Sequence, residues 1–258
     1  MITHQITNSY GNYSYNAFIY KKTLWDPHFH GNYELIYNIE GSTRVNVNGI
    51  SDVLDTGEMI LVPPYTVHSL EADESSRTWV GVFSPDFISS FSEKNKFCRF
   101  SKFRCKTEIE DILKEHLFHE REQQLYMHIG CLYMVCSECI NNAQLYASDH
   151  DGVFMNKVIK YISENLNEDI SLKDTASALN YEYHYFSGLF NRYFSMNFKS
   201  FINIFRFEKA CKLLTDKNRD MASICSKCGF GSIRIFDRVF KSLSGVTPSE
   251  YRKRYLGL

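Results

Sequence analysis

The stretch that decides the fold of the C-terminal part of this chain is Met221-Ala-Ser-Ile-Cys-Ser-Lys-Cys-Gly-Phe-Gly-Ser-Ile-Arg-Ile-Phe-Asp-Arg-Val-Phe-Lys-Ser-Leu-Ser-Gly-Val-Thr-Pro-Ser-Glu-Tyr-Arg-Lys-Arg254. Residues 221–227 have the composition of a short helix, and Gly229 and Gly231 follow it closely. Two glycines so close together permit a sharp turn with positive φ. Ser232 then has the side chain and the position expected of a residue that caps a second helix.

The second predicted helix has two contrasting faces. Apolar residues recur at helical spacing on one face: Phe236, Val239, Phe240 and Leu243. Charged residues recur on the other: Arg234, Asp237, Arg238 and Lys241. Gly245 is a candidate left-handed stop, and Thr247-Pro248-Ser249-Glu250 is a capping box that opens a third helix. A helix, a tight turn and a helix with a basic outer face form the helix-turn-helix that reads a DNA major groove.

This stretch also resembles the second half of the DNA-binding domain of AraC-family transcription regulators. The residues that carry the resemblance are Cys228-Gly-Phe-Gly-Ser232, Phe236, Arg238-Val-Phe-Lys241, Gly245 and Thr247-Pro-Ser-Glu-Tyr-Arg252. The resemblance implies a sequence-specific DNA-binding regulator of transcription, which we expect to be an activator. Its macromolecular partners would be double-stranded DNA and RNA polymerase.

An earlier part of the chain repeats the pattern at an offset of 50 residues. Phe186, Leu189, Phe190 and Tyr193 fall on Phe236, Val239, Phe240 and Leu243, and Asn197 falls on Thr247 as a helix cap. We therefore expect two copies of one unit, with helices over 171–179 and 183–194 in the first copy and a linker helix over 198–215. A further helix over 153–165 precedes them. Two recognition helices on one rigid pair of units can enter successive major grooves about 34 Å apart.

The family resemblance also assigns DNA contacts by position. The residues that would face bases are Glu182, His184, Ser187 and Gly188 in the first unit and Ile233, Arg234, Asp237 and Arg238 in the second. Arg234 and Arg238 can form bidentate contacts with guanine, and Ile233 can contact a thymine methyl group. Gly188 stands where the family usually has Arg, and Ser195 where the unit usually has its stop glycine, so we expect the first unit to read sequence weakly. Candidate phosphate contacts, which could also be an ordinary solvated face, are Lys199, Arg206, Lys241, Arg252, Lys253 and Arg254.

The N-terminal part has the pattern of short antiparallel strands. Apolar and polar residues alternate between Tyr33 and Leu61, interrupted by turns at Gly41, Gly49 and 55–57, and Trp79-Val-Gly-Val-Phe83 adds a further strand. Such strands indicate a barrel or a jelly roll. We therefore predict an α+β protein of two domains: an N-terminal β-barrel with a helical hairpin, and a C-terminal all-α domain of two helix-turn-helix units joined by a linker helix.

The barrel region is similar to the two sequence motifs of cupins. His28-x-His30-x3-Glu34-x6-Gly41 matches the first motif, and Gly57-x5-Pro63-x4-His68 matches the second. The match fails at Tyr65, where cupins usually have Gly, and at Ala72, where they usually have Asn. In metal cupins the three histidines and the glutamate bind one divalent ion, whereas in AraC-type sensors such residues often remain without a catalytic metal. We expect no cofactor, and His28, His30, Glu34 and His68 stay as candidate metal ligands.

Aromatic residues lie close in sequence to these polar groups, which suggests a pocket for a small polar effector. Aromatic faces with polar tips suit sugar rings, and a sugar is also the effector class that the family resemblance favours. The alternative is that the aromatic residues fill the barrel core. The predicted effector-binding residues are His28, His30, Tyr33, Glu34, Tyr37, Tyr65, His68 and Trp79.

Between the two parts, the period changes to that of helices. Two amphipathic helices are predicted over 107–142, with their turn at 121–124, from Ile109, Ile112, Leu113, Leu117, Leu125, Ile129, Leu132, Tyr133, Cys136 and Ile140. In the family such helices commonly pack on the barrel and pair two subunits, so we expect a homodimer. The predicted organisation is a sensing and dimerisation domain over 1–142 (barrel about 1–90), a linker over 143–152 and a DNA-binding domain over 153–258.

Charge is divided unequally along the chain. Residues 153–258 hold 17 Lys and Arg against 10 Asp and Glu, whereas the preceding residues hold 12 against 20. A basic C-terminal part suits a polyanionic partner.

No leader-like or membrane-spanning apolar run is present, so we expect a cytoplasmic protein with reduced cysteines. The pairs Cys136/Cys139 and Cys225/Cys228 have the spacing of zinc ligands, but they also fit small apolar residues on buried helix faces.

Two alternatives to a ligand-controlled regulator follow from these features. The helical repeats could bind another protein instead of DNA, although the basic charge and the arginines argue against it. The barrel could be a metal-dependent cupin enzyme or sensor fused to a DNA-binding domain. Because no nucleophile triad, phosphate-binding loop or pair of catalytic carboxylates is found elsewhere, we predict that the protein is not an enzyme.

Overall fold

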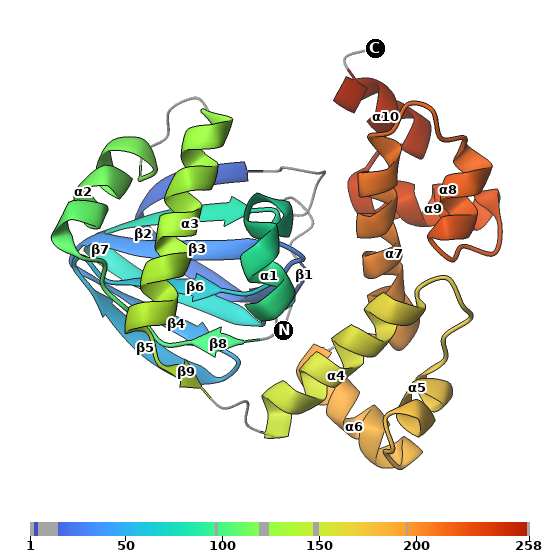
Figure 1. Ribbon diagram of the computed structural model, residues 1–258. Coiled ribbons are helices and arrows are strands. Elements are labelled where there is room, and N and C mark those ends of the chain that lie inside the picture. The colour runs from blue at the N-terminus through green and yellow to red at the C-terminus, as the bar shows by residue number, and fades with distance from the viewer. Residues whose placement is uncertain are drawn as a thin grey trace. The chain divides into compact units, whose positions relative to one another are not determined.

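The computed structural model describes residues 3–4, 15–95, 98–118, 124–146, 150–194 and 196–256. The chain forms two compact units, and the main division falls between Asp149 and His150. The first unit is an antiparallel half-barrel with helices on one side, and the second is entirely helical (Figure 1). The predicted α+β fold with a cupin-like N-terminal domain and a helix-turn-helix C-terminal domain is therefore confirmed.

Two long strands organise the N-terminal sheet, β2 (Tyr15–Phe29) and β7 (His68–Phe83). They pair along nearly their whole length, while the first half of β7 also pairs with β4 and its second half with β3. Because one strand serves both halves, the sheet curls over on itself, and Lys22, with a φ of 103°, sits at the bulge where the register shifts. The remaining strands are β1 (Thr3–His4), β3 (Tyr33–Glu40), β4 (Ser42–Val47), β5 (Ile50–Asp55) and β6 (Met59–Val62).

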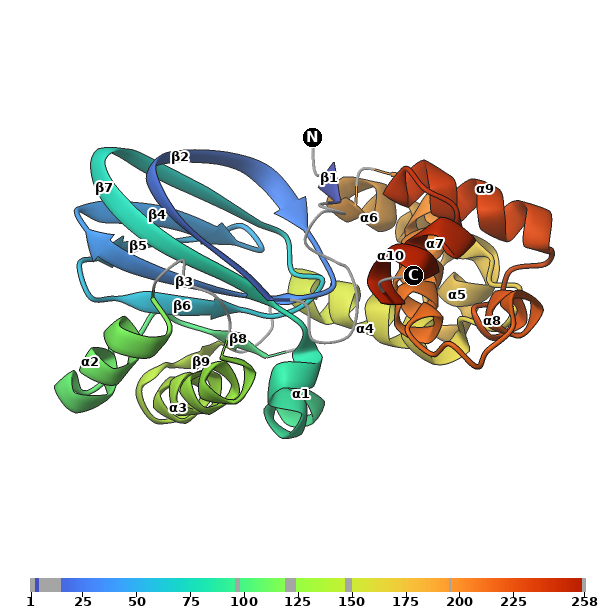
Figure 2. The same cartoon turned by 90° about the horizontal axis from the view of Figure 1, so that it is seen from above.

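Two apolar clusters lie on opposite faces of this sheet. One fills the inside of the half-barrel and includes Ile36, Val62 and Val82. The other includes Leu35 and Phe83 and is covered by helices, which Figure 2 shows beside the layer that contains β3 and β6. Successive side chains of a strand point to opposite faces, so neighbours such as Leu35 and Ile36 belong to different cores.

The covering helices are α1 (Ser89–Asn95), α2 (Thr107–His116) and α3 (Leu125–Asn142), with a 3₁₀ turn, η2 (Pro85–Ile88), before them. The predicted pair of helices over 107–142 is confirmed, while residues 121–123 of their expected turn lie outside the described residues. Four residues assigned to the buried faces are instead 37–52% exposed: Ile112, Leu125, Tyr133 and Ile140. The expected linker is also partly ordered, because β9 (Leu145–Tyr146) pairs with β8 (Arg99–Phe100) and the next helix begins at His150.

The C-terminal unit consists of α4 (His150–Asn165), α5 (Leu172–Ala178), α6 (Tyr183–Phe194), α7 (Phe198–Leu214), α8 (Met221–Lys227), α9 (Ile233–Ser244) and α10 (Pro248–Leu256). Local caps explain its helix boundaries: the side chains of Ser171, Asn197 and Ser232 each accept a hydrogen bond from a backbone N–H three residues on. Gly245 has the expected left-handed φ of 77°. Thr247 and Glu250 form the predicted reciprocal capping box.

The two helix-turn-helix units are copies with one difference. Asn180 and Gly229 are equivalent turn residues, with φ values of 59° and 79°, but α6 and α9 begin three and four residues after them. Gly231 is the additional residue, and of the two glycines only Gly229 has the positive φ that such a turn permits. The offset is therefore 49 in the first helices and turns and 50 in the recognition helices. Ser195, the expected stop of α6, lies outside the described residues.

Candidate functional site

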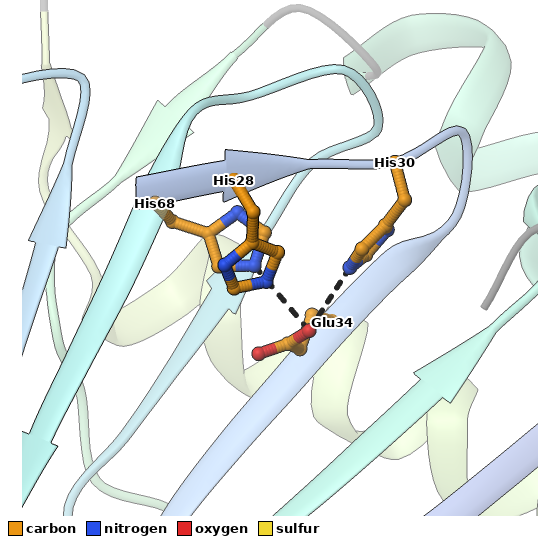
Figure 3. A group of neighbouring side chains, drawn as sticks. All are labelled: His28, His30, Glu34 and His68. Carbon is orange, nitrogen blue, oxygen red and sulfur yellow. Dashed lines mark hydrogen bonds and ion pairs between the residues drawn. The ribbon is translucent and has the colours of Figure 1, made fainter. Parts of the chain in front are cut away.

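Four polar side chains of the N-terminal unit converge inside the half-barrel, as Figure 3 shows. Pairing of β2 with β7 places His28 opposite His68, His30 follows the end of β2, and Glu34 lies on β3. Their candidate ligand atoms lie within 4.8 Å of one another, and none of the four side chains is more than 2% exposed. We call these four residues the His-Glu cluster.

Backbone carbonyl groups orient all three imidazole rings of the His-Glu cluster. In each, Nδ1 lies within hydrogen-bond distance of a carbonyl oxygen two residues away: His28 of Asp26 at 2.9 Å, His30 of Asn32 at 3.1 Å, and His68 of Thr66 at 2.8 Å. A carbonyl can only accept, so each Nδ1 carries the proton and donates it. The Nε2 atoms are thereby left to face the centre of the cluster.

At that centre, the Nε2 atoms and the carboxylate oxygens of Glu34 are all hydrogen-bond acceptors, and they have no donors unless protons or a cation are added. Nε2 of His30 lies 3.0 Å and Nε2 of His68 lies 3.3 Å from the Glu34 carboxylate, which is itself an acceptor. Burial opposes the charged state of both His68 and Glu34, but their mutual attraction prevails, raising the pKa of His68 and lowering that of Glu34. Burial, together with repulsion from His68, lowers the pKa of His28 to about 4, so His28 is neutral at physiological pH. Its Nε2, Glu34 Oε1 and His68 Nε2 are buried without a hydrogen-bond partner, although His68 Nε2 forms the 3.3 Å ion pair with Glu34.

A divalent transition-metal ion fits this donor set. Imidazole nitrogens and a carboxylate suit ions of the zinc, iron and nickel type, and carbonyl groups that hold Nδ1–H are the usual outer support of metal-bound histidines. The four ligand atoms, all within 4.8 Å of one another, lie close enough together to be shared by one such ion. An ion bound there would replace protons on the Nε2 atoms and satisfy the three atoms that lack a hydrogen-bond partner.

The aromatic residues predicted to share this site divide between two faces. Tyr33, Tyr37 and Trp79 lie on the opposite face of the sheet from Glu34, inside the apolar cluster beneath the helices. Tyr37 stacks on Phe118 at a ring-centroid distance of 4.1 Å. The expectation of one pocket lined by these aromatic side chains and the histidines is therefore wrong, because strand residues of odd and even number point to opposite faces.

Tyr65 remains beside the His-Glu cluster. Its backbone N–H donates to the carbonyl of His30 at 2.7 Å, and its side chain is half-buried. Its φ of 59° lies in the left-handed region, which explains why glycine is usual at this position of the cupin motif.

The second recognition helix, α9, presents its predicted base-reading residues to solvent. Arg234, Asp237 and Arg238 are exposed, and Ile233 is 47% exposed. The buried face of α9 is anchored by Phe236 and Phe240, and all four predicted base readers lie outside that anchored stripe.

The first recognition helix, α6, departs from the prediction at one residue. His184 and Gly188 are exposed and Ser187 is half-buried. The Glu182 carboxylate instead accepts a hydrogen bond from the backbone N–H of Tyr185 at 2.9 Å, so Glu182 caps α6 as Ser232 caps α9. Sequence reasoning also missed Tyr183, 42% exposed, which the offset of 50 places at the position of Ile233.

The predicted phosphate contacts fall into two groups. Lys199, Lys241, Lys253 and Arg254 are exposed. Arg206 instead donates to the carbonyl groups of Leu166 and Glu168, at 3.3 and 2.7 Å, and Arg252 donates to that of Leu214 at 3.3 Å. These two arginines are therefore engaged in holding the helices of the unit together.

The cysteine pairs have the features of core residues. Cys136, Cys139, Cys225 and Cys228 are all buried and form no disulfide. Burial raises the pKa of the Cys136 and Cys228 thiols to about 12. Across the described ranges, the His-Glu cluster is the one group of three or more His, Cys, Asp or Glu side chains close enough to share a metal ion.

Comparison with known proteins assigns both units. Residues 18–95 match the profile of the AraC-like ligand binding domain, and residues 175–254 match that of a helix-turn-helix domain. The transposon Tn10 TetD protein of Escherichia coli is 34% identical over 118 residues, which are 45% of this chain and 86% of TetD. The chain belongs to the AraC family of transcription regulators.

Other relatives of this AraC-family protein differ in how much they share with it. The Msm operon regulatory protein of Streptococcus mutans is 23% identical over 88% of this chain and 86% of its own length. The regulatory protein PocR of Salmonella typhimurium is 35% identical over 41% of this chain, a match that spans about a third (34%) of PocR. ToxT of Vibrio cholerae is a solved structure with a TM-score of 0.47 and 17% identity, covering 93% of this chain and 98% of ToxT.

Membership of the AraC family settles two of the sequence-based alternatives. The protein is a DNA-binding transcription regulator with an N-terminal ligand-binding domain, and it is not an enzyme. The interpretation as a cupin enzyme with a DNA-binding tail is therefore excluded. In the part of the chain that the structure describes, no helix is long and apolar enough to cross a membrane.

Proposed function

We propose that this AraC-family regulator is a sequence-specific activator whose DNA binding is controlled by an effector held at the His-Glu cluster. The observation that carries the proposal is a set of buried, convergent polar atoms, three of them without a hydrogen-bond partner, within the region that matches the ligand-binding family. Buried polar atoms without partners are costly, so a ligand that satisfies them gains affinity. A regulator of this kind would act in the cytoplasm, where DNA and RNA polymerase are its partners.

The class of effector follows from the donor set. A small polar molecule such as a sugar was the sequence-based expectation, and it depended on aromatic rings beside the histidines. Tyr33, Tyr37 and Trp79 are on the other face of the sheet, which removes most of that support. Three oriented imidazoles and one carboxylate favour a divalent transition-metal ion as the effector.

Metal analysis tests this choice of effector directly. Protein without a histidine tag, purified without chelators, is analysed for bound metal and then titrated calorimetrically with zinc, manganese and nickel ions. We expect about one ion per chain, lost in His30→Ala and kept in His184→Ala, an exposed histidine that serves as the matched control. If a sugar panel stabilises the wild type while the three ions bind neither strongly nor stoichiometrically, the effector is a polar molecule and the metal proposal fails.

The ion can control DNA binding only if the protein has two states, one with high and one with low affinity for DNA. The ion must then bind one of these states more tightly than the other. The ion should therefore change the affinity of the wild type for its selected DNA and leave that of His30→Ala unchanged. Fluorescence anisotropy with and without the ion measures this coupling. Equal DNA affinity in both conditions would mean that the His-Glu cluster is structural.

A homodimer is the second component of the proposal, and it rests on the outer face of α3. Tyr126, Gly130, Tyr133, Ser137 and Ile140 follow the alternating spacing of four and three residues that forms a helix-pairing stripe. Tyr126 is 86% and Ile140 is 52% exposed, and a Cβ at Gly130 would have no neighbour within 4 Å. Such a self-complementary stripe suits a second copy of α3 across a two-fold axis.

A further inference from the structure

The head of the first recognition helix, α6, carries a pair of aromatic rings that the sequence assignment did not include. Tyr183 is the first residue of α6 and occupies the position that Ile233 occupies in α9. Its ring packs edge-on against that of His184, with the ring centroids 5.2 Å apart. Both side chains are exposed, Tyr183 at 42%.

Tyr185, two residues further along, is oriented differently. Its ring stacks on Tyr181 of the preceding turn, with centroids 6.2 Å apart and an interplanar angle of 22°. Tyr181 is itself packed against Phe154 and Phe186. Tyr185 is therefore directed to the turn, although its exposed fraction, 60%, is larger than that of Tyr183.

Glu182 is engaged elsewhere. Its carboxylate accepts the backbone N–H of Tyr185, and the backbone N–H groups of His184 and Tyr185 lower the pKa of Glu182. A carboxylate that caps the helix N-terminus is directed at backbone amides of α6. The residues at the head of α6 that are left for a base are Tyr183 and His184.

We propose that Tyr183, supported by the His184 ring, is the base reader of the first helix-turn-helix unit, and that its aromatic ring contacts the C5-methyl group of a thymine in the major groove. The N-terminal residues of a recognition helix are those that reach base edges, and apolar side chains recognise thymine by its methyl group. Gly188 extends no side chain, so the aromatic pair meets no competing arginine on this face. This assignment rests on the proposed function, because it requires that the C-terminal unit read DNA.

The test uses the full chain and DNA selected from random duplexes. The wild type should enrich a two-part sequence, with each part read by one unit. Tyr183→Ala should lose the thymine preference in one part alone and bind the selected duplex at least about fourfold more weakly, the loss expected for one buried methyl group. Replacing that thymine by deoxyuridine removes the methyl group. This replacement should weaken DNA binding by the wild type about fourfold and leave DNA binding by Tyr183→Ala unchanged. Tyr183→Phe keeps the ring and should keep the preference.

Matched variants separate this assignment from its alternatives. Tyr185→Ala and Glu182→Ser, which retains a capping oxygen, should enrich the wild-type sequence. The assignment to Tyr183 is wrong if either of these variants loses the preference for the same thymine, or if Tyr183→Ala enriches the wild-type sequence with unchanged affinity. Sequence-specific DNA binding by the protein would remain supported in both cases. If the wild type enriches no sequence, the proposed DNA-reading function itself fails. Thermal melting of each variant checks that the exposed substitutions leave the fold intact.

Discussion

Replacing Gly81 with alanine should destabilise the half-barrel because the Trp79 indole occupies the space of the new methyl group. A Cβ at Gly81 would lie 2.2 Å from Trp79 Cη2 and 2.8 Å from Cζ3. The indole is fully buried, and the backbone of Gly81 is paired with Ala17 on one side and Leu35 on the other. Neither partner can move freely, so we expect an overpacking cost of about 3 kcal/mol. That cost corresponds to a fall of about 9 °C in the melting temperature of this unit.

Intrinsic fluorescence makes this prediction measurable in the full chain. The protein has two tryptophans, so Trp79 can be followed alone in a Trp25→Phe background. The control is Gly188→Ala on the exposed face of α6, where a Cβ meets nothing within 4 Å. Helix propensity predicts that this variant gains about 0.5–1 kcal/mol. The reasoning is refuted if the melting temperature of Gly81→Ala lies within about 1 °C of that of the wild type. It is also refuted if Gly81→Ala lowers the stability as much in a Trp79→Leu background, where the clash with the indole is absent.

Three further predictions concern other parts of the molecule. Arg238→Ala should weaken binding of the selected DNA by about 1–3 kcal/mol and reduce the sequence preference at one base position, while the circular dichroism spectrum stays unchanged. If fluorescence anisotropy shows unchanged affinity, Arg238 does not contact a base. Ile140→Glu, on the exposed stripe of α3, should shift the molar mass measured by light scattering from dimer to monomer, and a monomeric wild type would contradict the dimer proposal. Asn180→Val should lower stability in urea unfolding by about 1–2 kcal/mol, whereas Asn180→Gly should not, because φ at this turn is 59°.

The C-terminal unit could be predicted closely because its boundaries are encoded by neighbouring residues. The predicted ranges of α6 and α8 match the observed ones, and Asn197 and Ser232 cap the helices that they were expected to cap. A cap needs only a side-chain oxygen and an N–H three residues away, so a short stretch of sequence contains all of its information. The role of Glu182 was missed because a glutamate is an unusual residue at a cap.

The half-barrel was predicted less completely because its site depends on distant pairings. The resemblance to the two cupin motifs brought His28, His30, Glu34 and His68 together as a candidate group. Which face of β3 points inward could not be read, since residues 33–38 are all buried and show no alternation of exposed and buried positions. The pairing of β8 with β9 joins two-residue strands that are far apart in sequence, too short to leave any pattern.

The two recognition helices share a backbone plan but differ in surface chemistry, and the difference has a consequence for how DNA would be held. α9 exposes Arg234, Arg238 and Lys241, whereas α6 has no Lys or Arg before Arg192. Contacts made by cations to phosphates weaken steeply as salt rises, because they release counterions, while contact between an aromatic ring and a thymine methyl group releases none. The second unit should therefore supply most of the salt-dependent affinity, and the first should contribute base preference that persists at high salt. On this reasoning, loss of charge in α9 weakens binding and makes it less dependent on salt, whereas loss of the ring in α6 changes which sequence is bound.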